Sequence, residues 1–239
     1  GDVYVGAYLD DQRHGIGAFT GADGYKYEGE WVEGRAEGTG TVTYPDGSVQ
    51  TGLFKDNLAD GSGSITYPDG STYVGDWSAG VIEGQGRATY PNGMVYEGGF
   101  VDARNEGQGT LDYGDGRSYV GNWKAGLRHG TGTATYPDGT VYVGEFVEGR
   151  RAGTGKITMA SGFVYEGEWA DGEIEGAGTA TYANGDVYVG AFKDGKRQGT
   201  GTMTYATGEQ ASGDWDNGAL AQPATGETAE PAAETTATD

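Results

Sequence analysis

The chain contains no cysteine, so disulfide bonds, zinc–thiolate sites and thiol catalysis are excluded. It also has few basic residues: 15 Lys and Arg stand against 36 Asp and Glu, which gives a formal net charge of −21. This balance argues against nucleic acids and anionic membrane surfaces as partners, since both attract clustered Lys and Arg. No run approaches the roughly 18 apolar residues of a membrane-spanning helix, and the N-terminus lacks the basic and apolar regions of a signal peptide. The cellular compartment stays open.

Glycine is the residue that the chain has in excess, with 49 of 239 positions. The excess follows a period of 23 residues that no insertion breaks. Gly stands two positions after the start of each repeat and an aromatic residue four positions after it, so the glycines belong to a repeated architecture. The repeats start at residues 4, 27, 50, 73, 96, 119, 142, 165, 188 and 211.

Each repeat predicts one β-hairpin. In the repeat that starts at Tyr27, residues 27–31 alternate Tyr, Gly and Trp with Glu, and residues 38–44 alternate in the same way, which is the period-two pattern of strands. The Pro-Asp-Gly sequence that follows is typical of a tight turn. Because every connection is short, we expect successive strands to be antiparallel neighbours. The sequence therefore predicts an all-β fold, an elongated, twisted, open-ended single-layer antiparallel β-meander of about ten hairpins and about nineteen strands.

Aromatic residues and glycines share one face of this predicted sheet, so large rings can cover the bare backbone of the glycines. One hairpin cannot bury its rings alone, and we expect stability to come from stacking between neighbouring repeats. The glycines to which the pattern assigns a structural role are, in three of the repeats, Gly29, Gly38, Gly40, Gly75, Gly84, Gly86, Gly121, Gly130 and Gly132.

The repeat pattern divides the chain into two parts. Residues 1–218 form the array, and residues 219–239 become an acidic Ala, Thr, Glu and Pro tract that we expect to be a disordered tail. Gly1 occupies the phase of Gly24 and Gly47, so the chain begins inside the closing turn of a repeat. This start predicts an excised or processed fragment.

The motifs resemble the MORN (membrane occupation and recognition nexus) repeat family, whose signature runs approximately Tyr-x-Gly-x-Trp/Phe, then His-Gly-x-Gly and a later Tyr-x-x-Gly. The clearest instances are YVGNWKAGLRHGTGTATYPDG from Tyr119 and YVGAFKDGKRQGTGTMTYATG from Tyr188. The resemblance implies an elongated, often dimeric scaffold that binds an extended or helical peptide along its groove, and an association with phospholipids. The His of the signature occurs only at His14 and His129, and the basic character of the family is largely lost.

The aromatic residue four positions after each start alternates between Trp and a smaller ring, so Trp recurs every 46 residues. One interpretation is duplication of a two-hairpin unit whose large and small rings fill a curved interior. The other is an exposed aromatic row that binds a partner. Under the second interpretation the predicted partner-binding face consists of Tyr27, Trp31, Tyr73, Trp77, Tyr119, Trp123, Tyr165 and Trp169.

No residues are predicted to be catalytic or to bind a cofactor or metal. The carboxylates lie on repeated turns rather than in a cleft, and His14 and His129 lie five repeats apart. One Asp per 23 residues suits turn geometry better than a calcium site. The favoured function is a non-enzymatic scaffold that binds a protein or peptide. The alternatives are a membrane- or phospholipid-associated module, which the charge disfavours, and a glycan-binding repeat protein.

Overall fold

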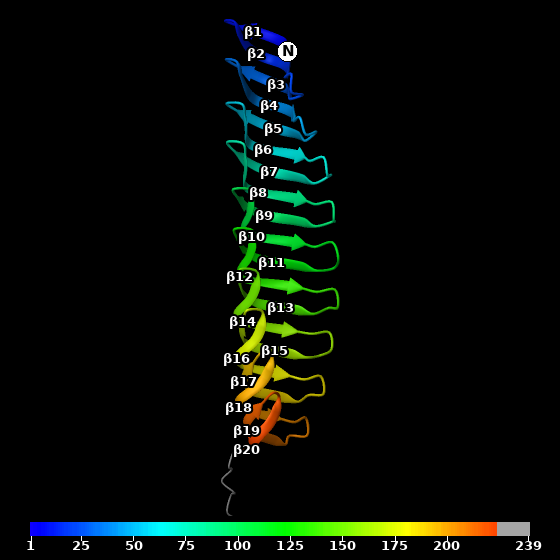
Figure 1. The fold of residues 1–239 in the computed structure, drawn as a ribbon, viewed down its shortest axis with the longest axis vertical. Helices are drawn as coiled ribbons and strands as arrows, with labels where there is room; N and C mark the ends of the chain where they lie inside the picture. Colours follow the sequence, from blue (N-terminus) through cyan, green and yellow to red (C-terminus); the bar gives the residue numbers. More distant parts are fainter. Residues whose placement is uncertain (224–239) are drawn as a thin grey trace, which may run out of the picture.

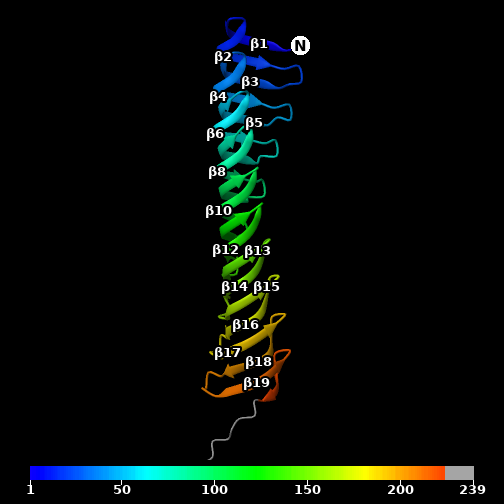
Figure 2. The ribbon, with the colours of Figure 1, turned by 90° about the vertical axis from the view of Figure 1, so that its left-hand side faces the viewer.

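The computed structural model describes residues 1–223 of the chain. Within them, 20 antiparallel β-strands form one sheet in which each strand pairs with its neighbours in sequence. The strands lie across the long axis and stack into a rod (Figure 1; turned by 90° in Figure 2). The sheet is open and unclosed, as the sequence predicts.

The first strand of each hairpin has seven residues, and the second has nine except in the last pair, where it has five. The strands of the N-terminal half are β1 (Val3–Leu9), β2 (Gln12–Thr20), β3 (Lys26–Val32), β4 (Arg35–Thr43), β5 (Val49–Lys55), β6 (Leu58–Thr66), β7 (Thr72–Ser78), β8 (Val81–Thr89), β9 (Val95–Val101) and β10 (Arg104–Asp112). Those of the C-terminal half are β11 (Ser118–Lys124), β12 (Leu127–Thr135), β13 (Val141–Val147), β14 (Arg150–Thr158), β15 (Val164–Ala170), β16 (Glu173–Thr181), β17 (Val187–Lys193), β18 (Lys196–Thr204), β19 (Gln210–Asp216) and β20 (Ala219–Pro223).

Two kinds of turn join the strands, one at each long edge of the rod. Within a hairpin the loop has two residues, such as Glu33 and Gly34 between β3 and β4, with φ of 48° and 79°. Positive φ at both positions is the type I′ turn, whose twist matches that of the strands. Between hairpins the chain turns through a short segment that reads Pro-Asp-Gly after Tyr44, Tyr67 and Tyr136 and ends in Gly in the remaining repeats as well. There the amide of Gly47 donates to the carbonyl of Tyr44 at 2.9 Å, and that of Ser48 donates to Asp46 Oδ1 at 2.8 Å.

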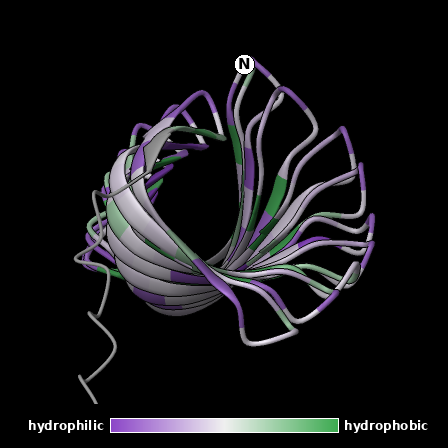
Figure 3. Cartoon of the chain, turned by 90° about the horizontal axis from the view of Figure 1, so that it is seen from below, coloured by the Kyte–Doolittle hydropathy of each residue, from purple (hydrophilic) through white to green (hydrophobic). Residues whose placement is uncertain are grey.

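An unbroken row of paired glycines crosses the sheet. Gly17 pairs with Gly29, Gly29 with Gly40 and Gly40 with Gly52, and the row continues to Gly213. Beside this row each hairpin changes register, for example between Gly29 and Trp31. Such bulges bend a strand and increase its twist. Figure 3, viewed along the rod, shows the curved strands and the rotation of each hairpin relative to the next.

The array extends five residues further than predicted. The sequence assigned residues 219–223 to the tail, but they form β20, which pairs with β19 through Asp216 and Ala219 at the last hairpin turn. The segment lacks the aromatic and glycine signature, and backbone pairing with β19 places it in the sheet. Residues 1–223 therefore contain 20 strands rather than about nineteen. The rest of the predicted disordered tail lies outside the described residues.

Among residues 1–223, no helix is long and apolar enough to cross a membrane.

Candidate partner-binding surface

The rings that begin each repeat lie flat over the glycine row. The Tyr27 hydroxyl donates to the carbonyl of Glu30 at 2.9 Å, so the ring runs along its own strand and covers Gly29 and Gly40. A Cβ placed on Gly40 would lie 2.5 Å from Tyr27 ring atoms. Any side chain here would displace the ring, which explains why these positions are glycine. We call the face that carries these rings the inner face.

A continuous edge-to-face arrangement of rings forms the core along the inner face. Tyr119 contacts Trp123 of its own strand at a centroid distance of 5.2 Å and Phe146 of the next repeat at 5.1 Å. Most other repeats reproduce this pair of contacts, so each Tyr links two repeats. Edge-to-face pairs of this kind contribute about 0.5–1.5 kcal/mol each beyond area burial. Neighbouring repeats therefore stack, as predicted, through a continuous chain of aromatic contacts.

Four of the five Trp side chains are also anchored by hydrogen bonds. Trp31 Nε1 donates to the carbonyl of Gly17 at 3.0 Å, and Trp215 Nε1 donates in the same way to Gly201 at 3.0 Å. Trp123 and Trp169 make the equivalent bonds to Gly109 and Gly155. The indole thus satisfies its donor inside the sheet and presents little of itself to solvent.

The eight residues predicted as a partner-binding face all lie in this core. None exposes more than 8% of its surface, and Tyr119 and Tyr165 expose none. They lie side by side along the inner face, as predicted neighbours, but they are buried beneath other side chains and form the floor of that face. The signal in the sequence was the repeat of rings beside glycines, and that signal does not separate a buried row from an exposed one. A partner would meet other side chains first.

Arginines complete the cover over the rings in some repeats. The Arg13 guanidinium lies 4.0 Å from the centroid of Trp31 and donates to the carbonyl of Gly34 at 2.8 Å. Arg151 lies over Trp169 at 4.4 Å. Where the chain has Asn105 at this position, the inner face is hollowed above Tyr96 and Trp123. The positively charged guanidinium groups of these arginines therefore lie directly on the aromatic core, in cation–π contacts.

One repeat interrupts the aromatic chain. Gln50 takes the place of the first Tyr, is only 3% exposed, and leaves Nε2 without a hydrogen-bond partner. Trp77 lies beside Gly63, and its Nε1 is also unpaired, unlike that of the other four Trp residues. The core is thus divided into a short N-terminal part and a long C-terminal part.

Burial changes the acidity of the core phenols. It raises the pKa of Tyr119 to about 12 and that of Tyr96, together with the nearby Glu106 carboxylate, to about 12. Desolvation disfavours the phenolate, so these rings stay neutral at physiological pH. These phenols therefore contribute hydrogen bonds and packing, and their pKa lies too high for proton transfer near neutral pH. Within residues 1–223, no three His, Asp or Glu side chains gather in a cluster that would hold a metal ion.

A second row of tyrosines lies beside the core, where the inner face meets the Pro-Asp-Gly turns. Five of these rings pack against the core and keep part of their surface accessible, whereas Tyr90 and Tyr205 are more exposed, at 41% and 39%. The sequence predicted only that these tyrosines lie at the end of a strand, although they recur every 23 residues. We call this row the tyrosine ladder: Tyr44, Tyr67, Tyr90, Tyr113, Tyr136, Tyr182 and Tyr205, with Met159 between the fifth and sixth members.

The tyrosine ladder lies in a negative field. Burial raises the pKa of Tyr67, and the neighbouring Tyr90, Asp46 and Asp69 raise it further. Hydrogen bonds from Ser71 lower the pKa of Asp69, so this carboxyl group stays charged. The turn aspartates are thus held in position by their turns, as the sequence predicted, and they give the edge a negative charge.

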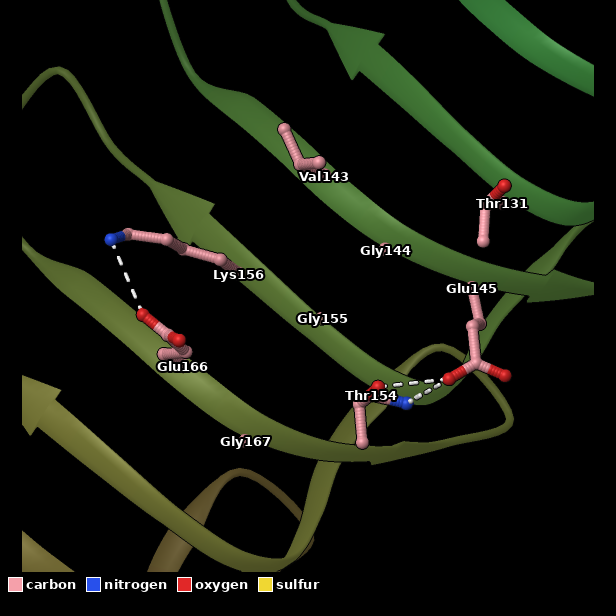
Figure 4. Close-up of a pocket in the computed structure, with 9 residues that line it drawn as sticks. All are labelled: Thr131, Val143, Gly144, Glu145, Thr154, Gly155, Lys156, Glu166 and Gly167. Atoms are coloured by element: carbon pink, nitrogen blue, oxygen red, sulfur yellow. Dashed lines mark hydrogen bonds and ion pairs between the residues drawn. The ribbon is translucent and has the colours of Figure 1, made fainter.

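The opposite, outer face exposes aliphatic side chains rather than aromatic rings. Val74, Val120 and Val143 are more than half exposed along it. A shallow hollow crosses the glycine row between β12 and β15 (Figure 4). There Lys156 pairs with Glu166 at 3.2 Å, and Glu145 accepts hydrogen bonds from Thr154. Such exposed ion pairs contribute little energy. Compared with this face, the tyrosine ladder offers more amphipathic ring surface, which is typical of interface hot spots.

Comparison with solved structures gives matches of low similarity. The TCP10 domain of Danio rerio CPAP matches with a TM-score of 0.46 and 14% identity, covering 82% of this chain and 93% of that one. The G-box domain of the microcephaly protein CPAP matches with 0.45 and 13%, covering 83% and 98%. The Drosophila melanogaster SAS-4 (dCPAP) TCP domain, solved in complex with a proline-rich motif of Ana2, matches with 0.40 and 17%, covering 74% and 90%.

Among curated proteins, none matches the chain significantly. The sequence profile of the MORN repeat, in contrast, matches nine times in succession, at residues 4–24, 27–49, 51–72, 73–95, 96–116, 119–141, 142–164, 165–187 and 188–210. These matches follow the hairpins of the structure one by one and cover most of the chain, which belongs to the MORN repeat family.

Proposed function

We propose that this chain is a non-enzymatic scaffold that holds a partner protein or peptide on the inner face of its ribbon. The observation that carries the proposal is the tyrosine ladder, a row of partly exposed rings that follows the rod and is backed by a rigid core. Half-exposed Tyr supplies apolar area and a polar tip at low entropic cost, which suits protein recognition.

In this proposal the eight predicted residues act indirectly. Tyr27, Trp31 and their equivalents form the floor of the inner face and support the ladder, because five of its seven tyrosines pack against that floor. The Trp row then determines the shape of the surface, and the ladder makes the contacts. Self-association into a homodimer stays a prediction, to be measured by light scattering of the purified chain.

The experiment compares three forms of the chain by affinity capture with quantitative mass spectrometry. One is the natural sequence, one carries Tyr67→Ser and Tyr113→Ser on the ladder, and the control carries Val120→Ser and Val143→Ser on the outer face. All four substituted residues are at least partly exposed, so folding, checked by circular dichroism, should be retained. We expect captured proteins to be lost with the ladder variant and kept with the control.

The opposite pattern, in which capture depends on the outer-face valines, would overturn the proposal. The two alternatives have direct tests. Flotation with anionic liposomes at about 0.15 M salt would favour a membrane module if the chain rose with the vesicles. A glycan array with specific hits would favour sugar binding, in which exposed rings stack on the ligand.

A further inference from the structure

The tyrosine ladder repeats at a spacing that matches one kind of peptide. Each repeat adds two strands, or about 9.6 Å of rod at roughly 4.8 Å per strand. A polyproline II helix completes one turn in three residues and rises about 9.3 Å. An α-helix presents the same side after two turns, about 10.8 Å, and so overruns each repeat by about 1.2 Å. An extended strand presents the same side about every 6.7 Å. The polyproline II peptide therefore matches the ladder most closely.

The chain itself shows how the ladder accommodates a cation. Arg117 lies at the turn that follows Tyr113, with its guanidinium 4.8 Å from the ring centroid. The same guanidinium pairs with both oxygens of Asp115, at 2.7 Å from Nη2 to Oδ2 and 3.1 Å from Nε to Oδ1. This bidentate pair over an aromatic ring is a complete arginine site, built from one ladder ring and the Asp two residues after it.

Three other repeats have the same ring and carboxylate without an arginine of their own. Tyr44 is followed by Asp46, Tyr67 by Asp69 and Tyr136 by Asp138, and the residue that corresponds to Arg117 is Ser48, Ser71 or Thr140. Hydrogen bonds from Thr140 lower the pKa of Asp138, as those from Ser71 do for Asp69, so both carboxylates are charged at neutral pH. In these three repeats no arginine among residues 1–223 lies over the ring and its Asp, so an arginine of a partner can bind there.

We infer that the tyrosine ladder from Tyr44 to Tyr136 binds a basic, proline-rich segment in the polyproline II conformation, with one turn of the peptide per repeat. Prolines stack on the ladder rings, and arginines of the segment take the position over Tyr44, Tyr67 and Tyr136 that Arg117 takes over Tyr113. The continuous run of five rings spans four repeats, so the segment has about 12 residues. The net charge of −21 favours this basic occupant over an acidic one.

This inference rests on the proposed scaffold function and specifies its ligand. The probe is a fluorescein-labelled peptide of four Arg-Pro-Pro units, titrated with the chain and read by fluorescence anisotropy at about 0.15 M salt. Two control peptides have four Arg-Gly-Gly units, with equal charge and a flexible backbone, or four Glu-Pro-Pro units, with opposite charge. We expect the Arg-Gly-Gly peptide to bind at least tenfold more weakly and the Glu-Pro-Pro peptide not to bind.

Two variants of equal charge test the arginine sites. Arg117→Ser removes the internal occupant of the ladder, whereas Arg87→Ser removes a basic residue from the outer face, where it lies 3.9 Å from Glu97. Opening one ladder site should tighten binding of the Arg-Pro-Pro peptide about fivefold in Arg117→Ser, with little change in Arg87→Ser. Substitution of Tyr67 and Tyr90 by Ser should abolish binding.

Equal binding of the Arg-Pro-Pro and Arg-Gly-Gly peptides would overturn the inference, because charge alone would then explain the affinity. Equal gains in Arg117→Ser and Arg87→Ser would overturn it for the same reason. If no peptide binds while affinity capture still depends on the ladder, the polyproline inference fails and the scaffold proposal stands. If capture is also independent of the ladder, both fail.

Discussion

Replacement of Gln50 by Tyr should stabilise the rod, because it would reconnect the two parts of the aromatic core. In the intact repeats the first Tyr makes two edge-to-face contacts, as Tyr73 does with Trp77 at 5.6 Å and with Phe100 at 5.2 Å. A Tyr at position 50 would meet Phe54 and Trp77 in the same way. It would also remove the unpaired amide and let Trp77 Nε1 return to the carbonyl of Gly63, as in the other Trp repeats.

The magnitude follows from these contacts. Two edge-to-face pairs contribute about 1–3 kcal/mol, and each buried unpaired polar group that finds a partner or is removed recovers about 1–3 kcal/mol. Against this, the hydrogen bond from the Tyr44 hydroxyl to Gln50 Oε1 is lost, at about 1 kcal/mol. After allowance for repositioning Trp77, the net gain in unfolding free energy should be about 2–4 kcal/mol.

The assay must be local, since a repeat array need not unfold as one unit. Hydrogen exchange followed by mass spectrometry on peptides from β5–β8 should show slower exchange in Gln50→Tyr, and urea unfolding followed by circular dichroism should show a later first transition. Gln50→Leu removes the unpaired amide but adds no ring and should recover only part of the gain. The reciprocal change, Tyr96→Gln, should introduce the same break and destabilise by a similar amount. A folded Gln50→Tyr chain with unchanged or faster exchange in β5–β8 would refute the reasoning.

Three further predictions concern the glycine row, the turns and the core phenols. Gly132→Ala puts a Cβ into the Tyr119 hydroxyl and should cost several kcal/mol in urea unfolding, whereas Gly126→Ala, at a turn with φ of 84° and nothing within 4 Å, should cost about 1 kcal/mol. Ala103→Gly should stabilise by about 0.5–1 kcal/mol, because Ala103 has a φ of 57° in a type I′ turn and Gly relieves that strain; a loss of stability in the same assay would contradict this. Raising the pH should unfold the chain steeply, because phenols of the unfolded chain ionise near pH 10 whereas those of the core have a pKa of about 12; stability should therefore be constant just below pH 10 and fall between pH 10 and 12, as absorbance of tyrosinate and circular dichroism would show together. The phenols with this value are Tyr27, Tyr73, Tyr96, Tyr119, Tyr142 and Tyr165.

Much of the fold could be predicted because each local feature recurs in phase. The alternation of Tyr, Gly and Trp over 27–31 indicates a strand, and the coupling of rings to glycines indicates which face they share. The structure confirms the antiparallel meander, the hairpin per repeat and the open ends. It departs from prediction at β20, since Ala219–Pro223 pairs through its backbone and has no side-chain signature.

The candidate site was harder to predict, because periodicity gives the phase of a residue and not its exposure. Trp123 and Tyr113 both recur with the repeat and both carry large rings, yet Trp123 is buried between neighbouring repeats while Tyr113 lies at the edge beside the turn. The difference depends on how the bent strands fold the rings of one repeat over those of the next. The sequence contains a hint, since each ladder tyrosine directly precedes a turn that ends in Gly, where the sheet ends and rings have neighbours on one side only.

Departures from the repeat are therefore more informative about this surface than the repeat itself. Gln50 breaks the core and at the same time accepts the hydrogen bond of Tyr44, the first ring of the ladder. Arg117 is a basic residue in a row bordered by Asp46, Asp69, Asp115 and Asp138, and it covers Tyr113. A uniform array would present identical rings at every step and would bind a repetitive ligand in any register. With Tyr44 held by Gln50 and Tyr113 covered by Arg117, successive positions of the ladder differ, and a partner that reads them in order must align in one register.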